Sequence, residues 1–178
     1  MDFTGKRVLV VGTGVSGIAA IRLLAAEGAK PVVLEGNEKA EQEQIREKIP
    51  AGIPYDLIIG NLPEEIMDTL DLAVLSPGVP TDLPFVIRLQ DKKIPVWGEI
   101  ELAYACGKGR LAAITGTNGK TTTTALTGAI MREYYDSVFV VGNIGLPYTE
   151  YAREMKDSSV TVAEVSSFQL ETIHSFRP

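Results

Sequence analysis

The chain has 178 residues, of which 45% are hydrophobic and 22% are charged, and its formal net charge is −6. This length and composition are typical of one or two globular domains and exclude a disordered or fibrous chain. The negative charge argues against nucleic acid and anionic membrane surfaces as partners, so we expect any anionic ligand to be held by local groups.

The single cysteine, Cys106, permits no disulfide within the chain and favours a reducing compartment. The first residues, MDFTGKRVLVVG, predict a β-strand and lack the basic and apolar layout of a signal peptide. No apolar run approaches the ~18 residues that a membrane span needs. We therefore expect a cytoplasmic location and no membrane insertion.

The first half of the chain alternates between short apolar runs and amphipathic stretches. The apolar runs predict buried parallel strands at residues 7–11, 31–34, 57–59, 72–75 and 94–97. Helical periodicity predicts helices at residues 16–27, 38–47, 64–69 and 85–91. This alternation predicts an α/β fold class, with a Rossmann-like parallel sheet covered by helices on both faces.

A second strand–helix series follows a bridging helix at 99–105 and a polar break at 107–110. Strands are expected at residues 111–115, 137–141 and 159–165, and helices at residues 120–133, 147–155 and 167–175. We place a domain boundary near Gly98, which gives domains 1–97 and 98–178. A three-stranded sheet is small, and a proline soon after a helix usually leads into another strand, so we expect the chain to be part of a longer protein.

The first glycine motif is Gly12-Thr-Gly-Val-Ser-Gly17, between the first predicted strand and the first predicted helix. Glu35 follows 18 residues after Gly17, at the end of the second strand, where an acid can bind a ribose hydroxyl. Spacing alone favours NAD as the ligand. The alternative is a tight turn whose glycines only allow close packing.

A second motif, Ser76-Pro-Gly78, follows the predicted strand at 72–75. In an open α/β sheet, ligands bind at the carboxyl ends of the strands, so Gly12, Glu35 and Ser76 would converge on one crevice. The alternative is an ordinary type I or II turn.

The third motif, GTNGKTT, occupies residues 116–122 between a predicted strand and a predicted helix. Such a loop binds phosphates through its backbone N–H groups and the positive end of the helix, with Lys120 as a point charge and Thr121 on Mg²⁺. Ile114 stands where the Walker pattern has its first glycine. A Gly-Lys-Thr triplet that begins a helix by chance is the alternative.

Two more polar groups follow the remaining predicted strands. Asn143, within the glycine-rich segment 142–145, can donate and accept hydrogen bonds to a substrate; a simple turn is the alternative. Glu164 ends the last strand, where a carboxylate beside a phosphate loop can bind the Mg²⁺ of a nucleotide. The alternative for Glu164 is a purely structural carboxylate. Ser166 or Ser167 is expected to cap the last helix.

Taken in order, these motifs resemble the Mur ligases of peptidoglycan synthesis. GTNGKTT is shared by that family, and the string SSFQLE at residues 166–171 is typical of the member that adds D-glutamate. The resemblance covers essentially all of the chain. It implies a UDP-binding N-terminal domain, part of a P-loop ATPase domain, and a further C-terminal domain.

The resemblance implies a role for each motif, and it changes the ligand of the first one from NAD to the UDP part of UDP-N-acetylmuramoyl-L-alanine. The residues implied for this substrate are Gly14, Val15, Ser16, Glu35, Ser76, Gly78, Asn143 and Ser166. The residues implied for ATP are Gly116, Thr117, Asn118, Gly119, Lys120, Thr121 and Thr122. Lys120 and Glu164 are the implied catalytic residues, and Thr121 and Glu164 the implied Mg²⁺ ligands. Glu35 stands where the family often has Asp, which leaves the detail of uracil recognition open.

The implied activity is ATP-dependent amide formation through an acyl phosphate, with D-glutamate as the second substrate. Groups that bind D-glutamate and much of adenine are implied to lie beyond this chain, so the chain alone is expected to be inactive. The full-length enzyme is expected to be a monomer. Two other classes stay open: an NAD-binding oxidoreductase domain and a non-catalytic nucleotide-binding module.

Overall fold

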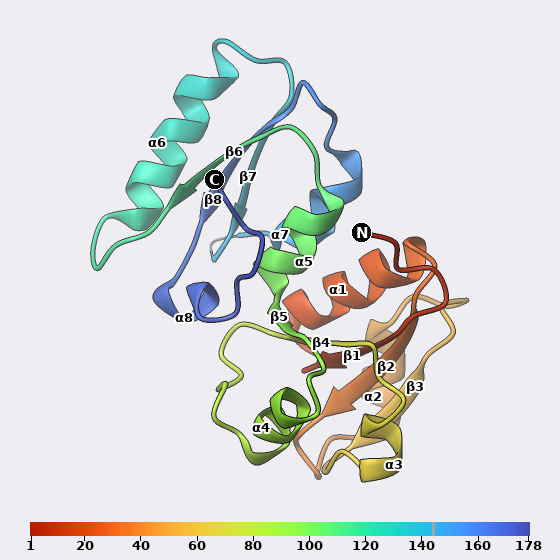
Figure 1. Cartoon of the computed structure of the whole chain (residues 1–178). Helices are drawn as coiled ribbons and strands as arrows, with labels where there is room; N and C mark the ends of the chain where they lie inside the picture. The colour runs from red at the N-terminus through yellow and green to blue at the C-terminus, as the bar shows by residue number, and fades with distance from the viewer. Residues whose placement is uncertain (144) are drawn as a thin grey trace.

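Two parallel β-sheets, one from each half of the chain, organise the fold (Figure 1). The structure is a computed structural model that describes residues 1–143 and 145–178. In the first sheet the strand order is β3-β2-β1-β4-β5, and all neighbours are parallel. Its strands are β1 (Arg7–Val11), β2 (Lys30–Glu35), β3 (Asp56–Ile59), β4 (Leu72–Leu75) and β5 (Val96–Gly98).

Helices cover both faces of the first sheet, because alternate apolar residues of each strand point to opposite sides. Val8 and Val10 pack with α1 and α2, whereas Leu9 and Val11 pack with α3 and α4. The four helices are α1 (Val15–Ala26), α2 (Gln42–Lys48), α3 (Glu64–Met67) and α4 (Pro84–Asp91). This arrangement confirms the predicted α/β class with a Rossmann-like sheet.

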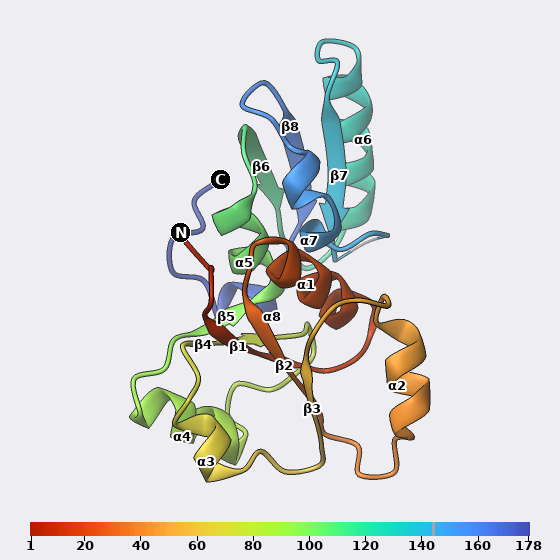
Figure 2. The same ribbon diagram turned by 90° about the vertical axis from the view of Figure 1, so that its right-hand side faces the viewer.

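The second sheet has the strand order β6-β8-β7, again all parallel. Its strands are β6 (Arg110–Ile114), β7 (Val138–Gly142) and β8 (Val160–Glu164). The long helix α6 covers the outer face, as Figure 2 shows, and α5 and α7 lie between this sheet and α1. The helices are α5 (Glu99–Cys106), α6 (Lys120–Arg132), α7 (Tyr148–Tyr151), a 3₁₀ turn (Ala152–Glu154) and α8 (Ser167–Leu170).

The two sheets share one hydrophobic core. A single cluster of buried residues joins Ile18 of α1 to Ile100 of α5 and Val141 of β7. Two ion pairs cross the same interface, Arg22 to Glu150 at 3.1 Å and Arg153 to Glu27 at 3.2 Å. Because the core continues past the end of β5, the division into domains 1–97 and 98–178 stays a prediction. None of the described helices combines the length and apolar character that a bilayer span requires.

The predicted helix at residues 167–175 is wrong beyond Leu170, where α8 ends. The backbone N–H groups of His174, Ser175 and Phe176 donate to the carboxylate of Glu101 at 2.9, 2.8 and 3.0 Å. A longer helix would send these groups to carbonyls four residues earlier. The acceptor that ends the helix comes from α5, far away in the sequence.

Other helices are also shorter than predicted, and the one expected at 64–69 ends at Met67. The helix expected at 38–47 begins only at Gln42, because Asn37 accepts from the backbone of Lys39 at 3.1 Å and of Ala40 at 2.9 Å, which forms a turn. The helix expected at 147–155 divides into the short helix α7 and the 3₁₀ turn.

The bonds to Glu101 predict a measurable pH dependence of stability. Burial raises the pKa of this carboxyl, but the hydrogen bonds from residues 174–176 outweigh burial and lower the pKa below its ordinary value of 4.5. When the pKa of a carboxyl group is lower in the folded protein than in the unfolded chain, the group stabilises the fold at pH values above its unfolded-state pKa. This stabilisation is lost as the pH falls through the pKa of the folded state. We expect Glu101→Gln to lower the free energy of unfolding at pH 7 by about 2 kcal/mol, and by clearly less at pH 3.

Thermal unfolding followed by circular dichroism at the two pH values measures this difference. Glu47→Gln, which changes an exposed carboxylate of α2, is the control and should have no effect at either pH. Equal destabilisation by Glu101→Gln at pH 7 and pH 3 would contradict the prediction.

Candidate functional site

The loop between β6 and α6 carries the GTNGKTT motif, and its residues 115–119 are exposed. Gly119 adopts a left-handed φ of +76° immediately before α6, a conformation that glycine adopts without strain. The ammonium Nζ of Lys120 donates to the carbonyl oxygen of Gly116 at 2.7 Å and contacts that of Thr117 at 3.5 Å. The Lys120 ammonium is therefore bonded to backbone carbonyl groups of the loop that precedes α6. A phosphate bound in this loop could replace these carbonyl oxygens as the acceptor.

Glu164 lies beside this loop, at the end of the central strand β8. It is in register with Ile114, the last residue of β6, and with Gly142 of β7. The residue is 2% exposed, and one carboxylate oxygen accepts from the Asn143 amide at 3.1 Å. The other oxygen is buried and has no hydrogen-bond partner among the described residues. An unpaired buried acceptor costs about 1–3 kcal/mol, and a bound cation would satisfy it.

No group of three or more His, Cys, Asp or Glu residues that would hold a metal ion occurs in residues 1–143 and 145–178. The predicted ligands Glu164 and Thr121 supply two oxygens. Mg²⁺ that arrives with a nucleotide usually takes one or two protein oxygens and completes its octahedron with phosphate oxygens and water. The residues present fit that kind of metal site.

The glycine motif of the first sheet forms a tight turn that leaves the start of α1 open. A Cβ at Gly17 would lie only 2.0 Å from the carbonyl oxygen of Gly12, so the helix packs closely on the strand. The helix has no side-chain cap at Gly14, and Val15 is 73% exposed. The N–H groups of Val15 and Ser16 are therefore placed at the positive end of a helix, where an anion is stabilised.

Ser76 and Glu35 flank this turn. The Ser76 hydroxyl is buried against Gly12 and Gly17 and has no hydrogen-bond partner among the described residues. Glu35 accepts from the Thr13 hydroxyl and from the Asn37 N–H at 3.0 Å. Burial raises the pKa of Glu35, but the hydrogen bonds from Thr13 and Asn37, together with the charge of Lys48, outweigh burial and lower the pKa, which favours the ionised form as an acceptor.

Lys48 is a candidate that the sequence did not indicate. It lines a hollow of about 470 Å³ at the start of α1, together with Thr13, Val15 and Leu146. The charged segment that contains Lys48 is typical of a solvated helix face, and only the packing of α2 beside α1 brings the lysine over the hollow. A cation at this position would complement the anion site at the N-terminus of α1.

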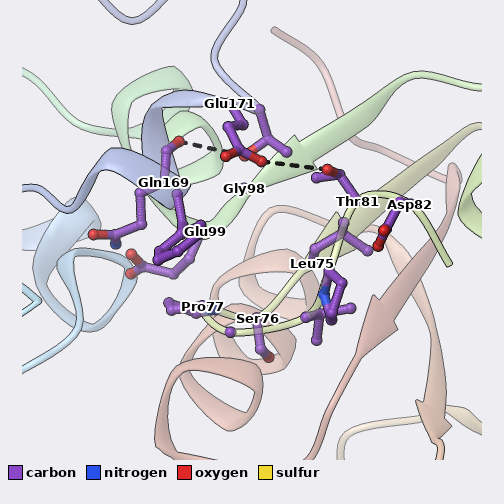
Figure 3. Close-up of a pocket in the computed structure, with 14 residues that line it drawn as sticks. Leu75, Ser76, Pro77, Thr81, Asp82, Gly98, Glu99, Gln169 and Glu171 are labelled. Carbon is purple, nitrogen blue, oxygen red and sulfur yellow. Dashed lines mark hydrogen bonds between the residues drawn. The ribbon is translucent and has the colours of Figure 1, made fainter.

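A cavity of about 530 Å³ lies between the two halves of the chain (Figure 3). One wall is the segment that follows β4, with Ser76 and Gly78, and the other contains Gln169 and Glu171. The Thr81 hydroxyl donates to Glu171 at 3.3 Å and bridges the two walls, as Figure 3 shows. The structure therefore brings the second motif and the SSFQLE string together at one cavity.

Ser166 lies at the start of α8 and forms a capping box with Gln169, which confirms the predicted cap. The Ser166 hydroxyl accepts from the Gln169 N–H at 3.3 Å, and the Ser166 N–H donates to the Gln169 side chain at 2.9 Å. Gln169 and Glu99 both line the cavity, and sequence reasoning named neither as a site residue. The ligand roles of all predicted site residues stay predictions.

Two parallel sheets, with a glycine-lysine-threonine loop and a buried carboxylate at the same sheet edge, are features of the α/β proteins that bind nucleotides. The family model of the Mur ligase MurD-like N-terminal domain matches residues 6–98, and that of the Mur ligase middle domain matches residues 114–177. The chain therefore belongs to the Mur ligase family, which confirms the resemblance.

The chain is 57% identical over 178 residues to the UDP-N-acetylmuramoylalanine–D-glutamate ligase of Lachnoclostridium phytofermentans. It is 52% identical to the ligase of the same name from Lachnospira eligens. Each match covers 100% of this chain and 39% of the relative, so the chain spans about two fifths of their length. The crystal structure of the UDP-N-acetylmuramate–alanine ligase MurC from Thermotoga maritima has a TM-score of 0.51 at 23% identity. That match covers 90% of this chain and 37% of the other, and it shows a common fold alone.

Proposed function

We propose that this chain contains the UDP-substrate site and part of the ATP site of a ligase that adds D-glutamate to UDP-N-acetylmuramoyl-L-alanine. The names of the relatives that match the whole chain support this proposal. The observation that carries it is the unpaired, buried oxygen of Glu164 beside the GTNGKTT loop. A cation bound with a nucleotide would give that oxygen a partner.

In this proposal the loop residues 116–122 hold the phosphates of ATP. The N–H groups at the start of α6 and the ammonium of Lys120 neutralise charge on the transferred phosphoryl group. Thr121 and Glu164 bind Mg²⁺, which when present polarises the phosphate oxygens. The Asn143 amide holds one Glu164 oxygen and leaves the other for the metal.

The UDP part of the other substrate is proposed to bind at the start of α1. The N–H groups of Val15 and Ser16 face the diphosphate, Glu35 the uracil region, and Gly14 allows the close approach. Ser76 and Gly78 contact the substrate where the cavity of Figure 3 opens. Asn143 and Ser166 approach it from the second sheet.

The proposed reaction needs no covalent enzyme intermediate. The L-alanine carboxylate takes the γ-phosphoryl group of ATP, which releases ADP and gives an acyl phosphate. The D-glutamate amine then attacks the acyl carbon, and the C–O bond to phosphate breaks. The contribution of this chain is to hold the carboxylate near the triphosphate and to neutralise the developing charge.

An NAD-binding oxidoreductase is the second candidate, because GxGxxG followed by Glu35 also suits NAD. It gives no reason for Lys120 and Glu164 to share a sheet edge. A non-catalytic nucleotide-binding module accounts for that edge but not for the cavity between the two sheets.

Calorimetry on the full-length protein distinguishes these candidates. We expect UDP-N-acetylmuramoyl-L-alanine and UDP to bind, and NAD to give no heat of binding. We also expect ADP release that requires both UDP-N-acetylmuramoyl-L-alanine and D-glutamate. Binding of NAD without binding of the UDP compounds would refute the proposed function.

A further inference from the structure

We propose that Glu99 is a positioning residue for the UDP substrate: it caps α7 from the junction of the two sheets and thereby fixes the loop that carries Asn143. The inference rests on the proposed function of the cavity between the sheets. Glu99 is the first residue of α5, directly after β5, so it belongs to the segment that joins the two halves of the chain.

The contacts of Glu99 are those of a helix cap supplied from another element. One carboxylate oxygen accepts from both the N–H and the hydroxyl of Thr149, each at 2.7 Å. Helix α7 begins after Pro147, which has no side-chain acceptor to offer the first N–H groups of the helix. Glu99 supplies that acceptor from α5.

The burial of Glu99 is unusual for a carboxylate. Its side chain is 2% exposed, and no ion pair with Glu99 occurs among the described residues. Burying a carboxylate without a nearby cation costs free energy. A helix N-terminus at the surface is usually capped by a serine or threonine side chain at much lower cost. The position of the acceptor between the sheets is therefore what distinguishes Glu99 from an ordinary cap.

A short chain of contacts connects α7 to the proposed site. The loop before α7 is closed by the bond from the Gly142 N–H to the Leu146 carbonyl at 3.0 Å. Within this loop the Asn143 N–H donates to the backbone carbonyl of Glu164 at 2.9 Å, and its amide donates to the Glu164 carboxylate at 3.1 Å. A shift of α7 would move Asn143 and the wall of the substrate site with it.

Glu99 also lines the cavity between the two walls that carry Ser76 and Gln169 (Figure 3). The same residue thus contacts the helix that orients the Asn143 loop and faces the space proposed for the substrate. This geometry assigns Glu99 to substrate positioning and not only to the stability of the interface.

Substitutions of Thr149 in the full-length protein test this assignment. Thr149→Val removes only the hydroxyl bond to Glu99, and Thr149→Ser keeps it. We expect Thr149→Val to weaken calorimetric binding of UDP-N-acetylmuramoyl-L-alanine about tenfold, the equivalent of about one hydrogen bond. Thr149→Ser should stay within about twofold of the wild type, and Glu99→Ala, which removes the acceptor, should weaken binding at least as much as Thr149→Val does.

Arg153→Ala is the matched control, since it breaks an exposed ion pair with Glu27 across the same interface without touching Glu99. It should leave substrate binding unchanged. If Thr149→Val and Glu99→Ala lower the melting temperature but leave the Kd unchanged, Glu99 is only structural and the inference is overturned. A wild-type protein that fails to bind the UDP substrate overturns the proposed function itself.

Discussion

Replacing Lys120 by alanine should lower kcat/KM for ATP by about a thousandfold, the range seen when a group that stabilises transferred charge is removed. The lysine already lies over the phosphate-type loop, bonded to the Gly116 carbonyl at 2.7 Å. Its ammonium would be the positive charge nearest the transferred phosphoryl group. ADP release by the full-length protein with both substrates present measures the effect.

Lys156→Ala is the control for this experiment, because Lys156 is an exposed lysine outside the candidate site. Circular dichroism of the Lys120→Ala variant should show an unchanged fold, since the bonds of Lys120 are to carbonyl groups of an exposed loop. Activity of Lys120→Ala within about tenfold of the wild type would refute a direct role for Lys120 in neutralising charge.

Replacing Glu164 by glutamine should lower kcat about a hundredfold and remove the stabilisation of the protein by Mg²⁺ together with ATP. The same variant should be more stable than the wild type when no ligand is present. The reason is the buried Glu164 oxygen that has no partner among the described residues, because a neutral amide is less costly to bury than a charge. The amide oxygen can still accept from Asn143.

Thermal unfolding with and without Mg²⁺ and ATP tests this second prediction without a measurement of activity. Glu154→Gln changes an exposed carboxylate of the same half and should behave like the wild type. Equal stabilisation of Glu164→Gln and the wild type by Mg²⁺ and ATP would show that Glu164 is not a metal ligand.

These two predictions depend on residues that the sequence itself singled out. Lys120 belongs to a motif of seven consecutive residues, and Glu164 ends a strong apolar strand. Because the carboxyl ends of parallel strands meet at one edge, their proximity followed from the strand pattern. The strand pattern did not predict that one Glu164 oxygen has no hydrogen-bond partner. That depends on the position of the Asn143 amide, which donates to the other oxygen.

The predicted helix at 167–175 marks the limit of local reasoning. Helical periodicity continues through these residues, yet the chain leaves the helix at Leu170. The carboxylate that attracts the following N–H groups belongs to Glu101, 73 to 75 residues away. The amino-acid sequence predicts α5 only as a bridging helix, because its charged residues give no sign of which distant groups they will contact.

The parallel strands, the GTNGKTT loop and the order of the motifs could be predicted from the amino-acid sequence, because each depends on side chains close together along the chain. The contacts of Glu99 and Glu101 and the position of Lys48 became visible only in the folded chain. A buried carboxylate or an exposed lysine acquires its partners from whatever the packing of the two sheets brings within a few ångströms, and that distance is not encoded in local periodicity.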